Sequence, residues 1–391
     1  MKPSFHPMID TWKNIPSGTR VVVAMSGGVD SSVAAAVLAE RGCEVVGVTM
    51  KNFCYSEVPE EHAAAACCSL EAIEDARAVA RRLGIVHQVL DFEGPFREAV
   101  MDPFVAEYAA GRTPNPCVRC NRFVRFPQLW RKARMLGAEA VATGHYARAL
   151  RWADGNGAGD RVELRRPEDR AKDQTFYLWG LSPPLLERAL FPLGEMTKEE
   201  VRERARDLGL GTAEKPESQD ICFIPDGDLH GFLEREAAAR PALAGAGRFE
   251  PGPIRDADGR EVGTHPGSAF FTVGQRRGLG IAAGEPLYVT AIEDDNTLVV
   301  GPEEDLLTDG LEADDVNWLV APGEVPDGEF RAAVQIRYRS APAAATIAPG
   351  PGRTLAVRFD APQRAVAPGQ SAVVYDGDRV LGGGTIARSL A

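Results

Sequence analysis

The sequence lacks several features that define common classes of protein. Across 391 residues, no apolar run approaches the ~18 residues that a membrane span requires. The N-terminal segment MKPSFHPMIDTWKN has no apolar centre of the kind found in secretion signals. Hydrophobic residues make up 44% and charged residues 26% of the chain, a balance that excludes disorder as its main state. We therefore expect a folded cytoplasmic protein with no membrane partner.

Positive charge is also scarce. The chain has 44 basic and 56 acidic residues, a net charge of −12, and only seven of its basic residues are lysine, none of them after Lys215. This balance argues against a protein coated in basic surface for nucleic acid or anionic membrane. The seven cysteines are an odd number in a chain without a secretion signal, which favours reduced thiols kept for chemistry or metal over disulfide crosslinks.

The length predicts two or three domains, and the first half of the chain alternates strand-like with helix-like segments. Strands are expected at Arg20–Met25, Glu44–Met50, Ile85–Leu90 and Ala138–Ala142. Helices are expected at Ser31–Arg41, Leu70–Leu83, Pro95–Ala110, Val124–Leu136 and, after the capping box Thr197–Glu200, up to Leu208. This alternation predicts an α/β fold, a doubly wound and mostly parallel sheet covered on both faces.

After about Pro225 the helical periodicity fades and short β-type runs replace it. They lie at Phe270–Val273, Leu287–Ile292, Leu298–Val300, Ala332–Ile336, Leu355–Phe359 and Ser371–Tyr375. Such spacing predicts a small central β-rich domain followed by a C-terminal β-barrel. We place the domain boundaries at residues 1–225, 226–297 and 298–391.

The segment Ser26–Ser32 (SGGVDSS) lies between a buried-type strand and a helix. Glycines let the backbone approach a phosphate, while loop N–H groups, the helix N-terminus and serine hydroxyls supply donors. The lysine-containing Walker loop is absent. The alternative is a plain glycine turn capped by Asp30 or Ser31. Thr143-Gly144-His145 follows another strand, so it is expected at the same sheet edge.

The cysteines of the CxxC pair, Cys117 and Cys120, come just before a predicted helix, and Cys222 follows about a hundred residues later. A helix N-terminus beside Arg119 and Arg122 lowers a thiol pKa and so favours the reactive thiolate. The alternative is a pair of small buried side chains, and zinc would need a fourth ligand that we cannot identify. For a second group, Cys54, Cys67, Cys68 and His62, packing is the better interpretation.

Residues 112–134 contain seven basic side chains and no acidic one, interleaved with three aromatic residues. They are Arg112, Arg119, Arg122, Arg125, Arg131, Lys132 and Arg134, with Phe123, Phe126 and Trp130. A solvated helix face is the common reason for such a run. Its place beside the CxxC pair favours an RNA backbone entering an active site.

The SGGxDS motif resembles that of the PP-loop ATP pyrophosphatases, which adenylate a substrate oxygen and release pyrophosphate. The further motifs TPNPCVRCNR, ATGHYA, KDQTFYL, KPESQDICFI and GQRRGLGI, in this order behind AMSGGVDSS, resemble the tRNA-specific 2-thiouridylases over nearly the whole chain. The resemblance implies ATP and Mg²⁺ as cofactors. The positions it assigns to ATP are Ala24, Met25, Ser26, Gly27, Gly28, Val29, Asp30, Ser31, Met50 and Gly144.

The same resemblance implies sulfur transfer to the 2-oxygen position of the wobble uridine in a tRNA anticodon arm. Cys222 would carry a persulfide loaded by a cysteine desulfurase or a sulfur-relay protein. Cys120 would be its nucleophilic partner, able to form a disulfide with it. The positions assigned to tRNA are Asn115, Pro116, Cys117, His145, Lys172, Asp173, Gln174, Arg337, Tyr338 and Gln370.

Cys117 stands where a well-described branch of the family has an aspartate with an acid–base role. Three thiols, Cys117, Cys120 and Cys222, could instead ligate a [4Fe-4S] cluster that binds a hydrosulfide. The persulfide route, as the family default, is our preferred mechanism. Two rival functions stay open: another PP-loop enzyme, either a different tRNA thiolase or an amidating ligase, and a non-catalytic RNA-binding iron–sulfur protein.

Overall fold

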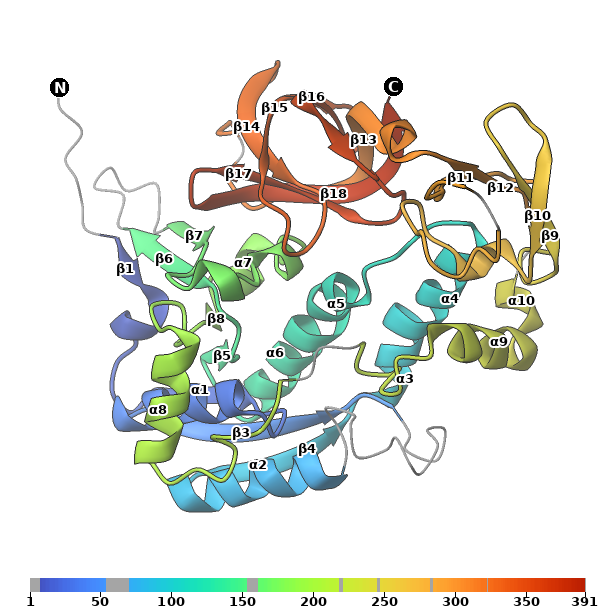
Figure 1. The fold of residues 1–391 in the computed structure, drawn as a ribbon. Helices are drawn as coiled ribbons and strands as arrows, with labels where there is room; N and C mark the ends of the chain where they lie inside the picture. Colours follow the sequence, from blue (N-terminus) through green and yellow to red (C-terminus); the bar gives the residue numbers. More distant parts are fainter. Residues whose placement is uncertain are drawn as a thin grey trace, which may run out of the picture. The chain divides into compact units, whose positions relative to one another are not determined.

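A five-stranded parallel sheet organises the N-terminal half of the protein (Figure 1). The computed structural model describes residues 8–53, 70–152, 161–217, 221–244, 247–281, 284–321 and 323–390. In spatial order the strands are β4 (Val86–Asp91), β3 (Glu44–Lys51), β2 (Arg20–Ala24), β5 (Ala140–Ala142) and β8 (Ala189–Leu190). The chain runs outward from β2 to β4 and then returns to β5 on the other side of β2. In sheets of this type, ligands bind where that order reverses, between β2 and β5.

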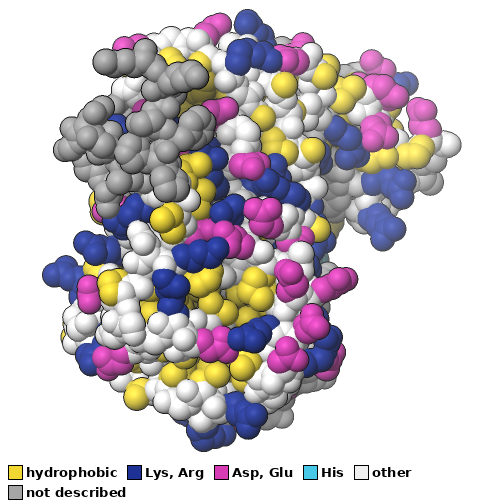
Figure 2. Space-filling view, turned by 90° about the vertical axis from the view of Figure 1, so that its left-hand side faces the viewer, with side chains coloured by type: hydrophobic (Ala, Val, Ile, Leu, Met, Phe, Trp, Pro, Cys, Tyr) yellow, Lys and Arg dark blue, Asp and Glu magenta, His cyan; other side chains and the backbone are white. Residues whose placement is uncertain are grey.

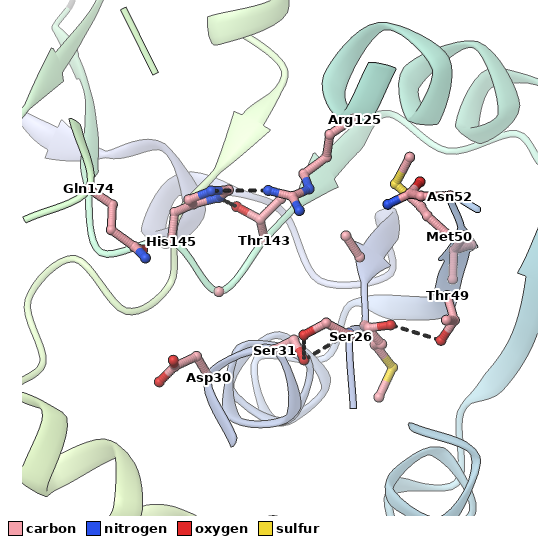
Figure 3. A pocket seen from close by; sticks show the side chains of 14 residues that line it. Ser26, Asp30, Ser31, Thr49, Met50, Asn52, Arg125, Thr143, His145 and Gln174 are labelled. Carbon is pink, nitrogen blue, oxygen red and sulfur yellow. Dashed lines mark hydrogen bonds between the residues drawn. The ribbon is translucent and has the colours of Figure 1, made fainter. Parts of the chain in front are cut away.

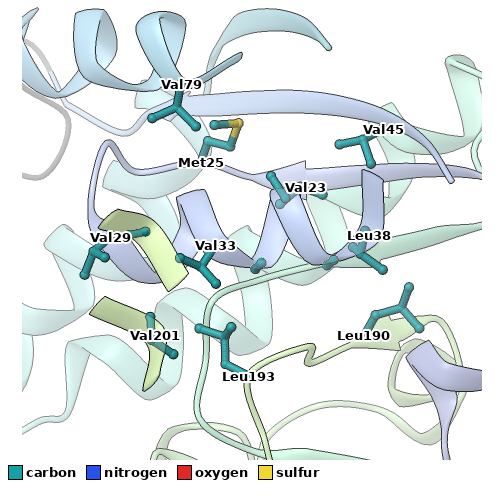
Figure 4. Close-up of a cluster of buried hydrophobic side chains, with 14 of the residues drawn as sticks. Val23, Met25, Val29, Val33, Leu38, Val45, Val79, Leu190, Leu193 and Val201 are labelled. Carbon is teal, nitrogen blue, oxygen red and sulfur yellow. The ribbon is translucent and has the colours of Figure 1, made fainter. Parts of the chain in front are cut away.

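The strands form because their side chains are apolar on both faces. Val21, Val22 and Val23 of β2 have no exposed surface, as expected for a central strand of a parallel sheet. Helix α1 (Val29–Glu40) is enclosed by β2, β3, α2 (Leu70–Leu83) and α8 (Lys198–Asp207), and its alanines allow that close packing. Figure 4 shows the resulting core. Each fully buried valine or leucine contributes about 1.5–3 kcal/mol relative to exposure.

Two helical segments contain π-helical turns: the predicted helix Pro95–Ala110 is interrupted by one, and the predicted helix Val124–Leu136 is preceded by another. The first comprises α3 (Glu93–Phe96), the π-turn η4 (Arg97–Met101) and α4 (Asp102–Ala109). The second comprises α5 (Pro116–Arg119), the π-turn η5 (Cys120–Arg125) and α6 (Phe126–Met135). Each π-turn precedes a helix with proline in its first turn, at Pro103 and Pro127. Proline donates no backbone hydrogen bond, so the regular pattern changes there, and such turns are frequent at functional sites.

The chain forms two compact units, one made of residues 1–99, 117–227 and 378–381, the other of residues 100–116, 228–377 and 382–391. The second unit contains a four-stranded sheet and a barrel. The sheet strands are β10 (Glu261–His265), β9 (Gly252–Arg255), β12 (Leu298–Gly301) and β11 (Tyr288–Ile292). The barrel strands, in order, are β18 (Arg379–Leu390), β13 (Leu307–Trp318), β16 (Thr354–Arg364), β15 (Ala343–Gly350), β14 (Phe330–Gln335) and β17 (Ser371–Asp376). Pairing of β17 with β18 closes the barrel, which confirms the expected fold class.

The shorter elements complete both units. In the first unit, β1 (Ile9–Asp10), β6 (Arg148–Trp152) and β7 (Arg161–Arg165) pair antiparallel, and α7 (Pro183–Leu186) precedes β8. Helices α9 (Leu229–Ala239) and α10 (Pro241–Ala244) belong to the second unit. Among the described residues, no helix is long and apolar enough to cross a membrane.

Two predictions about the second half are wrong. Phe270–Val273 is not a strand, because a 3₁₀ turn at Ser268–Phe270 leads into it and Gly274, with φ of +90°, ends it. Its apolar character reflects burial of Phe271 in the core of the small sheet. Helicity also continues past Pro225. Helix α9 begins at Asp228, whose carboxylate accepts the Gly231 N–H at 2.9 Å, and it buries Phe232 and Leu233.

The predicted capping box at α8 is confirmed and has a testable effect. The Thr197 hydroxyl accepts the Glu200 N–H, and the Glu200 carboxylate accepts the Thr197 N–H at 2.7 Å. We expect Thr197→Ala to weaken α8 by about 1 kcal/mol, seen as roughly fivefold faster hydrogen exchange of its amides. Thr197→Ser is the matched control and retains protection. Unchanged exchange in Thr197→Ala would show that the cap contributes nothing.

Candidate active site

The loop after β2 is shaped by close contacts between backbone segments. Met25 N–H donates to the Val48 carbonyl at 2.8 Å, which keeps the loop beside β3. Gly27 adopts φ of +74°, and a Cβ there would collide with the carbonyl oxygen of Ala72 on α2. Only glycine satisfies both conditions. These two contacts therefore restrict the backbone between β2 and the first turn of α1 to one conformation.

Serine hydroxyls hold this loop in place. Ser31 Oγ donates to the Gly28 carbonyl at 3.1 Å and accepts the Ser26 N–H at 3.2 Å. Ser32 Oγ donates to the same Gly28 carbonyl at 2.9 Å. The unsatisfied N–H groups of the first turn of α1 and the positive end of its dipole make this loop suited to an anion such as phosphate.

A cavity of about 190 Å³ lies at this edge of the sheet (Figure 3). Its walls come from the loop after β2, the end of β3, the loop after β5 and the π-turn η5. The lining residues are Ala24, Met25, Ser26, Asp30, Ser31, Val48, Thr49, Met50, Asn52, Arg125, Thr143, Gly144, His145 and Gln174. Seven of the ten positions that the resemblance assigned to ATP line the cavity. The other three, Gly27, Gly28 and Val29, belong to the phosphate loop but do not line the cavity.

Asn52 is a cavity residue that the sequence reasoning missed. Its side chain is only 4% exposed, and its Oδ1 has no hydrogen-bond partner among the described residues. A buried amide oxygen without a partner is costly, and because Asn52 lines the cavity, this oxygen is a candidate acceptor for a ligand donor. Its position directly after β3 was the available signal, because the carboxyl ends of the strands line such sites.

Gly144 brings the loop after β5 against the phosphate loop. A Cβ at Gly144 would lie 2.7 Å from the carbonyl carbon of Asp30 and from the Ser31 nitrogen. The two loops that flank the switch point between β2 and β5 therefore touch through their backbones. Substitution by any larger residue would force them apart and widen the floor of the cavity.

His145 is held in one tautomer. Its Nε2 lies 3.4 Å from Nη1 of Arg125, and because a guanidinium can only donate, Nε2 must accept. Its Nδ1 therefore carries the proton and donates to Thr143 Oγ1 at 2.8 Å. Burial and the charge of Arg125 lower the pKa of His145 to about 3. The ring is neutral at physiological pH and serves as an acceptor toward Arg125.

A chain of alternating charges leads away from the phosphate loop. Both carboxylate oxygens of Asp30 accept from Lys198, at 2.7 and 2.9 Å, and the Tyr146 hydroxyl donates to Oδ1 at 3.0 Å. Lys198 also pairs with Glu217 at 2.9 Å, and Lys172 donates to both oxygens of Glu217. Against the effect of burial, the two lysines hold the pKa of Glu217 at about 2. Lys172, predicted to contact tRNA, is thus part of this network.

The three thiols expected to do chemistry differ in exposure. Cys117 is exposed on α5, Cys120 is buried at the start of η5, and Cys222 is partly buried in a turn. The CxxC pair lies within helical turns rather than before them. Helix α3 packs against η5, and its Phe96 contacts Phe223 edge-to-face at 5.8 Å. The segments that carry Cys120 and Cys222 therefore share α3 as a neighbour.

The described residues, which include Cys117, Cys120 and Cys222, contain no group of three or more His, Cys, Asp or Glu side chains that could hold a metal ion. In this arrangement the three thiols do not fit the ligand set of an iron–sulfur cluster. We therefore derive no chemical step through one. Cys54, Cys67, Cys68 and His62 lie outside the described residues.

Other residues predicted to contact tRNA in the first unit have clear structural partners. Asp173 pairs with Arg166, and its Oδ1 accepts the Thr175 N–H at 2.9 Å. Gln174 Oε1 accepts the Tyr146 N–H at 2.9 Å, which fixes the side chain at the cavity wall. These contacts fix both side chains in place.

The predicted tRNA positions in the second unit are of two kinds. Gln370 Nε2 donates to the Thr113 carbonyl at 2.9 Å, and so it joins barrel residues to the segment that contains Asn115 and Pro116. Among the described residues, no carboxylate pairs with Arg337, whose pKa is lowered by burial and by nearby Arg364. The cation Arg339 lies over the ring of Tyr338 at 5.6 Å. Because the half-buried guanidinium of Arg337 has no such carboxylate partner in the described part of the chain, it favours binding of an anionic ligand.

The environment of His145 predicts an unusual titration. Because its folded pKa is about 3 and an unfolded histidine titrates near 6.5, only the unfolded state gains a proton as pH falls below about 6.5. His145 therefore lowers the stability of the fold progressively from that pH down to about 3. Ring ¹⁵N NMR should show a neutral Nδ1–H tautomer from pH 8 to 5. Titration between pH 6 and 7 in the folded protein would contradict the assignment, and the urea-unfolded chain is the control.

Three known domain families match consecutive parts of the chain. Residues 19–226 match the tRNA methyl transferase HUP domain, residues 242–302 the tRNA methyl transferase PRC-barrel domain, and residues 308–386 the aminomethyltransferase beta-barrel domain. The first of these alone covers more than half of the protein. A solved 4-thiouridine synthetase–RNA complex with ATP shares 20% identity over 59% of this chain and 53% of that chain, with a TM-score of 0.36, a likeness too distant to support an inference.

Curated relatives match over nearly the whole length. The tRNA-specific 2-thiouridylase MnmA of Heliobacterium modesticaldum is 49% identical over 372 residues, which are 95% of this chain and 93% of that protein. The MnmA proteins of Geobacter metallireducens and Pelotomaculum thermopropionicum are 50% and 47% identical, each over 94% of this chain and over 96% and 97% of their own lengths. With this identity and coverage, the chain belongs to the family of tRNA-specific 2-thiouridylases.

Proposed function

We infer that this protein is an ATP-dependent tRNA 2-thiouridylase, which exchanges the 2-oxygen of the wobble uridine for sulfur. The observation that carries this conclusion is the cavity at the switch point, where a phosphate loop, a neutral histidine and an unpaired amide meet in a chain about half identical to such enzymes. The first half-reaction, adenylation of the uridine oxygen, would take place in this cavity.

The residues around the loop fit ATP with Mg²⁺. The first turn of α1, with Ser26 and Ser31, would bind phosphate oxygens, and the cavity that Gly144 lines would admit the approach of the α-phosphate to a substrate oxygen. Asp30 is the one carboxylate among the described residues that line the cavity, so we propose that it shares Mg²⁺ with the nucleotide. Mg²⁺ would neutralise charge on the departing pyrophosphate.

Sulfur transfer then requires two thiols in sequence. The terminal sulfur of a persulfide on Cys222 attacks C2 of the adenylated uridine, and AMP leaves with the former 2-oxygen. The Cys120 thiolate attacks Sγ of Cys222, so the sulfur–sulfur bond breaks and the transferred sulfur stays on the base. A Cys120–Cys222 disulfide forms, which an external thiol reductant must reduce before the next turnover. Cys117 is proposed to line the base position.

The remaining assignments are proposals of the same kind. We propose that the chain divides into domains at residues 225 and 297. The surface that contacts the anticodon arm would include Arg337, Tyr338 and Gln370. The residues that act nearer the target base would be Asn115, Pro116, His145 and Lys172–Gln174. A cysteine desulfurase or a sulfur-relay protein would load Cys222 in the cytoplasm. Arg337 supports this arrangement, because its charge lacks a carboxylate partner within the described residues.

The central test is mass spectrometry of tRNA nucleosides after incubation with ATP, Mg²⁺ and a sulfur donor. Wild-type protein should produce 2-thiouridine together with AMP and pyrophosphate, and Cys222→Ser should still release pyrophosphate but form no thiolated base. Cys43→Ser, at a buried cysteine in the core next to β3, is the matched control and should retain activity.

Three outcomes would contradict the proposal. Absence of 2-thiouridine with wild-type protein would remove the function itself. Full activity in Cys222→Ser would remove the persulfide route. A brown anaerobic preparation that absorbs near ~400 nm, with activity dependent on that colour, would favour the cluster mechanism instead.

Substitution of Asn52 is expected to weaken ATP binding without lowering the stability of the fold. Because its Oδ1 is unpaired in the protein, Asn52→Ala should leave the melting temperature unchanged or raise it. The same change should weaken ATP binding roughly three- to tenfold, the effect of one lost hydrogen bond. Isothermal titration calorimetry and thermal melts measure the two quantities. Equal ATP affinity, or a lower melting temperature without ligand, would exclude a ligand-binding role.

A further inference from the structure

Phe123 is an exposed aromatic side chain in the basic segment 112–134. It is 38% exposed, and it lies on the π-turn η5 among residues that are otherwise largely covered. Single exposed apolar residues are common and need no explanation by themselves. Phe123 differs because two cations accompany it. The Cζ atoms of Arg119 and Arg122 lie 5.1 and 4.9 Å from the centre of its ring.

Both guanidinium groups are held in place by the rest of the first unit. Arg119 Nε donates to the Ala99 carbonyl at 2.9 Å. The Arg122 guanidinium also lies 5.6 Å from the centre of the Trp179 ring, and its methylene groups pack where Gly180 has no side chain. The three side chains thus form an ordered group that presents one phenyl ring and two planar cations. We call Arg119, Arg122 and Phe123 the Arg–Phe platform.

The position of this platform relates it to the reaction. The same π-turn provides Cys120 at its start and Arg125 at its end, and Arg125 reaches His145 in the cavity wall. Phe123 is two residues from Arg125 and three from Cys120. Arg122 and Phe123 therefore lie on the same π-turn as a thiol proposed to react and a residue of the cavity wall.

We propose that the Arg–Phe platform stacks an unpaired RNA base next to the target uridine, an inference that rests on the proposed function. Unpaired bases stack on aromatic rings and on guanidinium planes, and the surrounding cations attract the phosphates that accompany them. No acidic residue occurs between Arg112 and Arg134 to oppose this contact. On the face displayed in Figure 2, by comparison, basic and acidic side chains are interspersed. Stacking a neighbouring base would also stabilise the loop conformation in which the uridine is turned out.

The test uses an anticodon stem-loop RNA in which 2-aminopurine replaces the base on one or the other side of the wobble uridine. Stacking quenches 2-aminopurine fluorescence, so binding to wild-type protein should quench at least one of the two RNAs. Phe123→Leu keeps an apolar side chain but removes the ring. It should abolish the quench and raise the Kd roughly 5- to 150-fold, the range measured for a lost base–aromatic stack.

Three further variants separate stacking from charge and from folding. Phe123→Trp should retain the quench, and Arg119→Lys, which keeps the charge but not the planar cation, should weaken it. Met135→Ala, at a side chain 77% exposed on α6, is the matched surface control and should bind as wild type. Because no phosphate contact is removed, the salt dependence of binding by Phe123→Leu should match that of wild type.

The outcomes distinguish this inference from the proposed function. If wild-type protein thiolates the unlabelled stem-loop but quenches neither labelled RNA, or if Phe123→Leu quenches and binds like wild type, the platform proposal is wrong and the enzyme assignment stands. If wild-type protein forms no 2-thiouridine at all, the proposed function has failed, whatever the fluorescence shows.

Discussion

The close approach of three backbone segments at the centre of the sheet is the constraint on which the site depends. Gly27 meets the carbonyl of Ala72, and Gly144 meets the backbone of Asp30 and Ser31. These contacts bring the N-terminal turn of α1 and the loop after β5 to one point. The phosphate loop, the neutral ring of His145 and the unpaired amide of Asn52 face a shared cavity only because no side chain separates those segments.

A network of charged side chains links the phosphate loop to the segment before Cys222. Asp30 belongs to the phosphate loop, yet both its oxygens are bound by Lys198, in the first turn of a helix that the Thr197 cap begins. Lys198 in turn pairs with Glu217, five residues before Cys222. A nucleotide with Mg²⁺ that competes for Asp30 would therefore act on the same lysine that holds the segment leading to the thiol. Adenylation and sulfur transfer would share this network rather than occupy independent sites.

Much of the fold was predictable because local signals and burial agree. The helix Leu70–Leu83 ends at the predicted residue, and the Thr197 box was found where its sequence indicated. The π-turn η5 was not predicted, since proline effects on hydrogen bonding one turn away leave no periodic signal. The sequence located the phosphate loop, but it assigned Arg125 only to the RNA-facing basic segment and missed Asn52. Their importance arises from an altered helical turn and an unpaired atom, which only the folded chain reveals.

The net charge of −12 is a sum over regions with different tasks. Residues 112–134 alone carry +7, so the rest of the chain sums to −19. A uniformly basic surface would bind any polyanion, whereas a basic segment in an acidic protein attracts RNA only where the chemistry occurs. Within that segment, charge alone does not distinguish one nucleotide from another. An ordered aromatic ring beside two guanidinium groups selects a base that is already unpaired, which is the state that the anticodon loop offers and a duplex does not.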